Sequence, residues 1–253
     1  MLLTPLDLLC ETPFHDAEGP ARSLVLSRLA DTELFAALVR EPAEGQAELQ
    51  IFDLPEGPVA LACDREERLA GFVGGPVAYV ALPGRVLAAA LAAEGQGLLV
   101  NPGQVSQMLL DNGTLAWLTR ALEARPSFAP DAAPERVTAP DPAVVAALAG
   151  PVSLRLGDMA DLVGRAALFA STYADGRRNH TLLLLGVAEP HREALAKAFA
   201  ELLAFLPEQP GGVDLGFADS AVPALAVVLE PPAPEVEAPA PQRDPKAPPR
   251  LRW

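Results

Sequence analysis

The residues with the clearest capacity for chemistry are Arg177, Arg178, Asn179 and His180, which lie together in the polar run ADGRRNH between two apolar runs. Two guanidiniums in one hairpin turn can hold a carboxylate or a phosphate through forked hydrogen bonds. The same composition is typical of an ordinary exposed turn. The run is therefore a candidate anion-binding site, with simple turn formation as the alternative.

A second candidate site combines Arg85 with the turn Asn101-Pro102-Gly103. Pro102 presets the backbone of that turn, and Gly103 can accept a positive φ. If the two loops follow parallel strands, they meet at the carboxyl ends of those strands, where open α/β sheets tend to bind ligands. Turn formation alone is again the alternative explanation.

The sequence contains no familiar catalytic or metal-binding signature. It lacks a phosphate-binding GxxxxGKS loop, a GxGxxG run after a strand, an HExxH helix and a GxSxG elbow. The histidines His15, His180 and His191 share no spacing that would hold a metal, and Cys10 and Cys63 form no CxxC pair. We therefore predict no catalytic residues, no metal and no cofactor, although an enzyme whose site cannot be read from sequence stays an alternative.

Charge and hydropathy restrict the class of protein. The formal net charge is -14, and residues 1–125 carry 17 acidic and 8 basic groups, a net of -9. A surface of that sign repels nucleic acid phosphates, so we expect no nucleic acid partner. No apolar run is long enough to span a membrane, and the first residues lack the basic region of a signal peptide. We expect a cytoplasmic protein with no membrane partner.

The elements that position these candidates are clearest between residues 58 and 103. PVALACD (58–64) reads as a buried strand, residues 65–73 as a short helix and PVAYVALPG (76–84) as a second strand. Residues 84–95 then form a helix with one apolar face, and GLLV (97–100) forms a short buried strand. The order is β-α-β-α-β.

That order, together with LPGR (82–85) and VNPG (100–103), resembles the SseB family, also called enhanced serine sensitivity proteins. The run ALFASTYADGRRNHTLLLLGV, followed by a helix and VDLGF, is similar to the C-terminal domain of that family. The resemblance implies two SseB-like domains that cover nearly the whole chain except its tail. The biochemical role of the family is poorly defined, so the resemblance implies a fold more than a function.

The remaining segments complete two domains. We predict an antiparallel meander of the strands at 34–39, 48–52 and 58–64, with helical turns at 105–110 and 114–124. In the second half we predict a strand at 152–156, a helix at 157–164, two strands joined across ADGRRN and a helix at 190–206. Strands at VDLGF and PALAVVLE follow.

The fold class that follows is α/β and α+β, with an N-terminal mixed sheet flanked by helices and a smaller C-terminal α+β sandwich. The predicted units are an N-terminal domain at 1–125, a Pro/Ala-rich linker at 126–150, a C-terminal domain at 151–230 and a Pro-rich flexible tail at 231–253.

The function expected from these features is a non-catalytic protein-interaction or regulatory module with a protein partner of unknown identity. The first alternative is a protein that binds a small molecule, an amino acid or another anion, at the arginine-bearing loops. The second alternative is the enzyme with an unreadable site.

Overall fold

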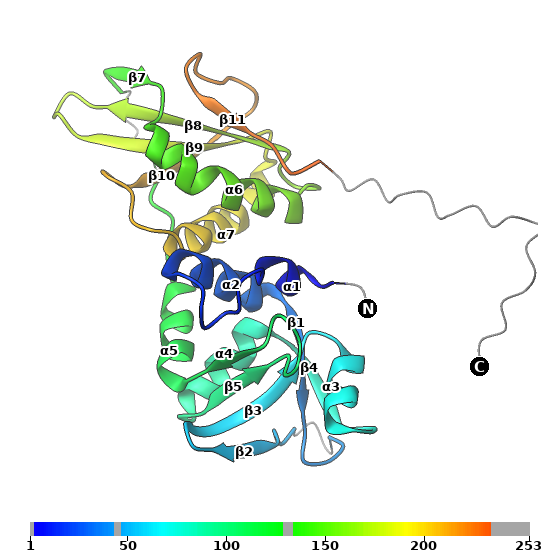
Figure 1. Cartoon of the computed structure of the whole chain (residues 1–253). Helices are drawn as coiled ribbons and strands as arrows, with labels where there is room; N and C mark the ends of the chain where they lie inside the picture. Colours follow the sequence, from blue (N-terminus) through cyan, green and yellow to red (C-terminus); the bar gives the residue numbers. More distant parts are fainter. Residues whose placement is uncertain (1–2, 43–46, 129–133, 234–253) are drawn as a thin grey trace, which may run out of the picture.

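The computed structural model describes residues 3–42, 47–128 and 134–233, which form two sheets, each with its own helices (Figure 1). The first sheet has six strands in the order β4-β1-β3-β5-β6, with β2 also paired to β3. The second has five strands in the order β10-β9-β8-β11, with β7 also paired to β8. Both sheets contain parallel and antiparallel pairs, so the predicted class of mixed sheets flanked by helices is confirmed.

The first sheet has most of its helices on one face. Its strands are β1 (Glu33–Ala37), β2 (Ile51–Leu54), β3 (Gly57–Cys63), β4 (Tyr79–Pro83), β5 (Gly97–Val100) and β6 (Met108–Leu110). The helices α1 (Pro5–Leu9), α2 (Gly19–Asp31), α4 (Gly84–Ala93) and α5 (Asn112–Ala121) share one large core with the sheet. The helix α3 (Glu66–Val73) packs on the other face through Leu69, in a much smaller core.

The predicted β-α-β-α-β order is found as β3-α3-β4-α4-β5, and α3 ends at a left-handed Gly74. One prediction for this half, the helical turns at 105–110, is wrong. Residues 108–110 form the edge strand β6, whose partner is β5, because alternate residues there reach the core. The expected antiparallel meander is present: the end of β1 pairs with the start of the second strand through a bridge between Leu38 and Leu49, and β2 pairs with β3. Beyond β2, the longer strand β3 also pairs with β1, whose other side pairs with β4.

The second sheet is covered on one face by two long helices. Its strands are β7 (Arg136–Thr138), β8 (Arg165–Thr172), β9 (Arg178–Leu185), β10 (Val213–Ala218) and β11 (Val227–Leu229). The helices are α6 (Pro142–Asp158) and α7 (Arg192–Ala204), and the short 3-10 helix η1 (Glu189–His191) leads into α7. The predicted hairpin, the long helix near 190–206 and both final strands are therefore present.

The region around residue 150 differs from the prediction. Helix α6 starts inside the expected linker and continues through residues 152–156, which were expected to form a strand. Val144, Leu148, Val152 and Leu156 are all buried at four-residue spacing, which matches one face of a helix and not the alternation of a strand. The expected helix at 157–164 is mainly turn, because α6 ends at Asp158. The expected tail falls outside the described residues from 234 onward.

The two halves of the chain share packing as well as a connection. Phe205, which follows α7, is buried in the core of the first sheet, where its ring lies edge-on to Trp117 of α5 with 5.5 Å between centroids. None of the helices in the described ranges combines the length and apolar character that a bilayer span requires.

Candidate functional site

The predicted anion site in the β8–β9 hairpin retains little free positive charge. The Arg177 Nε donates to Asp175 Oδ2 at 2.6 Å, and its guanidinium lies 5.5 Å from the Tyr173 ring centre. His180 is buried, and its Nε2 accepts a hydrogen bond from the Asp141 backbone at 3.3 Å. Burial lowers the pKa of His180, although the Asp141 charge opposes the shift, so the imidazole is neutral at pH 7. Of the two guanidiniums, only that of Arg178, which is exposed, has no described side-chain partner.

Asn179 lies beside this turn and points to a neighbouring strand. Its amide nitrogen donates to Asp214 of β10. Asp214 also accepts a hydrogen bond from the Ser127 hydroxyl at 2.5 Å. This carboxylate therefore attaches the segment around Ser127 to the edge of the sheet. The polar side chains of the hairpin thus stabilise the second sheet. They do not converge on one position where a ligand could bind.

The turn Asn101-Pro102-Gly103 is closed by its own side chain. Asn101 has a positive φ of 48°, and Gly103 has one of 76°. The Asn101 Oδ1 accepts from the Asp64 backbone at 2.9 Å, and its amide nitrogen donates to Ser106 Oγ at 2.9 Å. Because β3 and β5 are parallel, their carboxyl ends meet, and Asn101 ties them together there.

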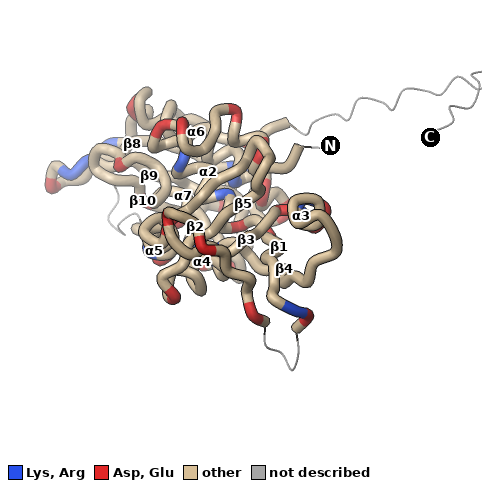
Figure 2. Tube along the Cα trace, turned by 60° about the horizontal axis from the view of Figure 1, so that its bottom comes forward, with Lys and Arg blue, Asp and Glu red and all other residues tan. Residues whose placement is uncertain are grey.

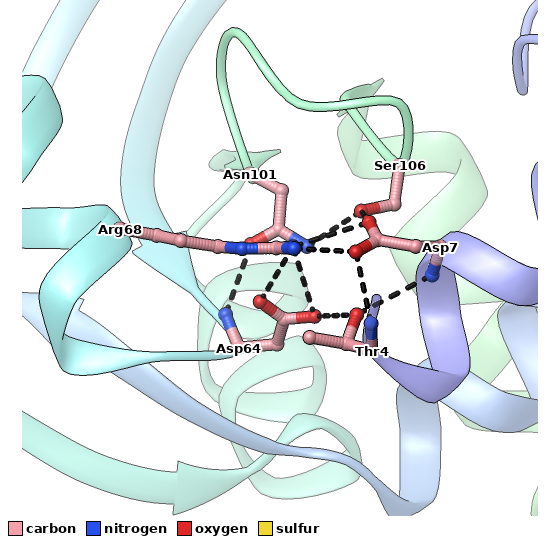
Figure 3. A network of polar contacts seen from close by, with 6 residues as sticks. All are labelled: Thr4, Asp7, Asp64, Arg68, Asn101 and Ser106. Atoms are coloured by element: carbon pink, nitrogen blue, oxygen red, sulfur yellow. Dashed lines mark hydrogen bonds and ion pairs between the residues drawn. The ribbon is translucent and has the colours of Figure 1, made fainter. Parts of the chain in front are cut away.

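Around this turn lies a buried polar network that the sequence did not suggest (Figure 3). The Arg68 guanidinium pairs with Asp7 of α1 and with Asp64, which follows β3. The side chains of Arg68, Asp7 and Asp64 are only 3%, 1% and 2% exposed. Ser106 Oγ donates to Asp7 Oδ1 at 2.5 Å, and Thr4 Oγ1 donates to Asp64 Oδ2 at 2.6 Å. The network therefore fastens α1 to α3 and to the turn after β5.

The electrostatics of this network favour a structural role. Burial raises the pKa of Asp7, but hydrogen bonds from Arg68, Ser106 and the Thr4 backbone outweigh it and hold that pKa well below its usual range. Asp7 is consequently ionised and cannot act as a general acid near pH 7. Burial, followed by the Asp64 charge, raises the pKa of the neighbouring Cys63 thiol to about 11, so Cys63 is no thiolate nucleophile.

Arg85 is placed far from that turn, in a second polar cluster at the junction of the two halves. The guanidinium of Arg85 pairs with Asp31 of α2 and, at 3.1 Å, with Glu201 of α7. We call the whole group the junction cluster; its cations are Arg28, Arg85, Arg155 and Lys197, and its carboxylates are Asp31, Asp158 and Glu201. These residues line a cavity of about 510 Å³. No described contact joins Arg85 to the turn at Asn101, so the second predicted site is divided between two places.

Sequence reasoning missed both clusters because their members are distant along the chain. Two local signals were available. Thr4 and Asp7 form a capping box around Pro5, which predicts a helix start, and Asp64 and Arg68 have the i, i+4 spacing of a helical ion pair. Neither signal indicates that the two pairs meet.

Metal binding finds no support in this geometry. Within residues 3–42, 47–128 and 134–233, no three or more His, Cys, Asp or Glu side chains are grouped so that they could hold a metal ion. Cys10 and Cys63 are both buried free thiols.

Comparison with known proteins supports the family resemblance for the first half of the chain. Residues 14–117 match the family model described as the SseB protein N-terminal domain. The matched span contains Arg68 and Asn101 but ends before the second sheet and begins after Asp7. No curated protein and no solved structure matches the chain. The SseB-like nature of residues 151–230 stays a prediction.

Proposed function

We propose that this chain, which carries an SseB N-terminal domain, is a non-catalytic protein-interaction module whose contact surface lies on the α3 side of the first sheet. We define the α3 surface by Val39, Phe52, Phe72 and Val73. The proposal includes a cytoplasmic location and an SseB-like C-terminal domain at residues 151–230.

The observation that carries the proposal is the thin cover of this sheet face. Among the described residues, the eight-residue helix α3 is the only helix that packs there, through Leu69, whereas four helices contribute to the core on the opposite face. The side chains of the α3 surface remain exposed, at 56% for Val39, 36% for Phe52, 54% for Phe72 and 46% for Val73. Exposed apolar side chains that share one face are typical of surfaces that bind other proteins.

Charge near the α3 surface favours a basic partner. Glu66 and Glu67 are in the first turn of α3, and Glu41 and Glu48 flank the loop between β1 and β2. Arg40 offsets part of this charge through an ion pair with Glu48 at 3.5 Å. Figure 2 displays the acidic positions along α3, β2 and this loop. A partner with apolar side chains framed by lysine or arginine complements such a surface.

The polar clusters support a non-catalytic role. In the Asp7–Arg68–Asp64 network both carboxylates are held by a guanidinium and by hydroxyl donors, away from solvent. A catalytic acid or base needs a group that can exchange a proton with a substrate. These carboxylates instead serve the attachment of α1, α3 and the turn after β5.

The experiment compares capture from a native lysate by the parent chain and by a Phe52→Ser/Phe72→Ser variant. We expect the parent to retain one protein in stoichiometric amount, and we expect the variant to bind that protein at least tenfold more weakly, because aromatic anchors dominate interface energies. The matched control is Val86→Ser, which changes a side chain of similar exposure, 47%, on α4.

Two results would refute the proposal. One is that the parent retains no stoichiometric protein. The other is that the identified protein binds the Phe52/Phe72 variant as it binds the parent, or that the Val86 control loses it equally. Urea unfolding of all three chains excludes a difference in folding as the cause.

A further inference from the structure

The junction cluster surrounds a cavity in which positive charge exceeds negative charge. Arg28 and Arg85 approach from α2 and α4 of the first half, and Arg155 and Lys197 approach from α6 and α7 of the second half. Three carboxylates, Asp31, Asp158 and Glu201, line the same space of about 510 Å³. Four cations against three carboxylates leave one unit of positive charge.

Two of the three carboxylates each contact two cations of the cluster. Asp31 accepts from both Arg85 and Arg155, and Glu201 accepts from Arg85 at 3.1 Å and from Lys197 at 3.4 Å. The Lys197 ammonium also donates to the Leu122 and Ala124 carbonyls at 2.6 and 2.7 Å. Each of these acids therefore contacts two cations but carries only one negative charge.

The arginines retain donors beyond these contacts. A guanidinium has five N–H donors, so Arg28, Arg85 and Arg155 offer about fifteen in all. Arg28 uses its two terminal nitrogens on Asp158, at 3.0 and 2.9 Å. Arg155 uses one on Asp31 and one on the Ser27 hydroxyl, which is 3.3 Å away. The cluster thus has spare hydrogen-bond donors where it also has spare positive charge.

The cavity is open to solvent, but part of its lining is buried. The side chain of Glu201 is 6% exposed and that of Arg155 is 9% exposed, while Arg28 and Arg85 reach 22% and 37%. Partial exclusion of water strengthens the attraction between these cations and an anion. Burial raises the pKa of Asp31, yet Arg155 and Arg85 outweigh burial and lower that pKa overall, as a local excess of positive charge requires.

We propose that this cavity binds a small oxyanion, the phosphate or carboxylate group of a metabolite, between Arg28 and Arg85 of the first half and Arg155 of the second. Guanidiniums bind such groups through paired hydrogen bonds. Because the ligand contacts both halves, its binding stabilises their junction. Ligand sites are common at domain interfaces for the same reason. This site is separate from the α3 surface.

The experiment is isothermal titration of the full chain with inorganic phosphate and, separately, with succinate, at an ionic strength held constant with sodium chloride. We expect one saturable site per chain for at least one of the two probes. Tighter binding of phosphate would identify a tetrahedral oxyanion as the preferred group, and tighter binding of succinate would identify a pair of planar carboxylates. Arg28→Gln and Arg85→Gln should each weaken binding at least tenfold. Arg120→Gln, which removes an equal charge from the exposed surface of α5, should leave it unchanged.

A variant with the opposite effect separates binding from stability. Asp158→Asn releases Arg28 and raises the excess charge of the cavity, so it should tighten the binding of the same probe several-fold, an outcome that damage to the fold does not produce. The proposal is overturned if neither probe gives saturable binding, if Arg28→Gln binds as Arg120→Gln does, or if Asp158→Asn weakens binding. Circular dichroism verifies that each variant is folded.

Discussion

Arg68 is the residue on which the buried network of the first half depends. Its guanidinium faces two carboxylates, and the side chains of Asp7, Asp64 and Arg68 are all nearly inaccessible to water. Replacing Arg68 with Met leaves both acids unpaired in the interior. We expect Arg68→Met to lower the free energy of unfolding by about 3 to 5 kcal/mol, because removing one partner of a buried ion pair has a cost of that size. Urea unfolding of the parent and of Arg68→Met measures this difference in free energy.

The neighbouring arginine provides the matched control for that substitution. Arg65 is half-buried and precedes α3 without being part of the network. Arg65→Met should change the free energy of unfolding by about 0.5 kcal/mol or less, as surface substitutions usually do. Equal effects of the two substitutions would mean that the network contributes no more than an exposed charge.

The same network makes stability depend on acid pH. The pKa of folded Asp7 lies below the ordinary aspartate value of 3.8, so the unfolded chain takes up the proton first as pH falls. The contribution of Asp7 is therefore complete above about pH 4 and is lost progressively below it. We expect the free energy of unfolding of the parent to fall more steeply between pH 4 and pH 2 than that of Asp7→Asn. Parallel pH profiles of the two chains would contradict this assignment.

At the scale of elements, the helices and strands that were predicted correctly are those whose own residues show a clear hydrophobic period. The order β3-α3-β4-α4-β5 was predictable because each run has a clear period and ends at Gly74, Gly95 or a similar stop. Helix α6 was missed because prolines at 142 and 151 suggest a linker, although Pro142 occupies the first turn, where a helix tolerates it. Strand β6 was missed because three residues are too few to reveal a period.

The candidate sites were less predictable than the elements, because they depend on contacts between distant segments. Asn101 was chosen for its place in a turn, and it does hold that turn, but its partners Asp64 and Ser106 come from other segments. Arg85 was chosen for a loop expected at the carboxyl end of a strand, beside Asn101, yet its partners belong to α2 and α7. Sequence spacing gives no sign of Glu201, which is 116 residues away.

At the scale of the whole molecule, the two halves are joined by apolar packing and by charge. Phe205 comes from the second half but is 2% exposed within the core of the first. Lys197 of α7 donates to two carbonyls at the carboxyl end of α5, groups that a helix leaves without partners of its own. Opening this junction therefore exposes apolar surface and uncovers the end of α5.

These contacts predict that the halves unfold together, and two phenylalanines at the end of the second half test this. Phe199 is buried in the core of the second sheet, and Phe205 in that of the first. Changing either residue to Ala should lower the free energy of unfolding by about 3 to 5 kcal/mol, the range for truncation of a core phenylalanine. Under joint unfolding, each variant speeds amide hydrogen exchange in both α5 and β9 to the same extent. If Phe199→Ala instead affects β9 and leaves α5 protected, while Phe205→Ala does the reverse, the halves are independent units and their junction contributes little to stability.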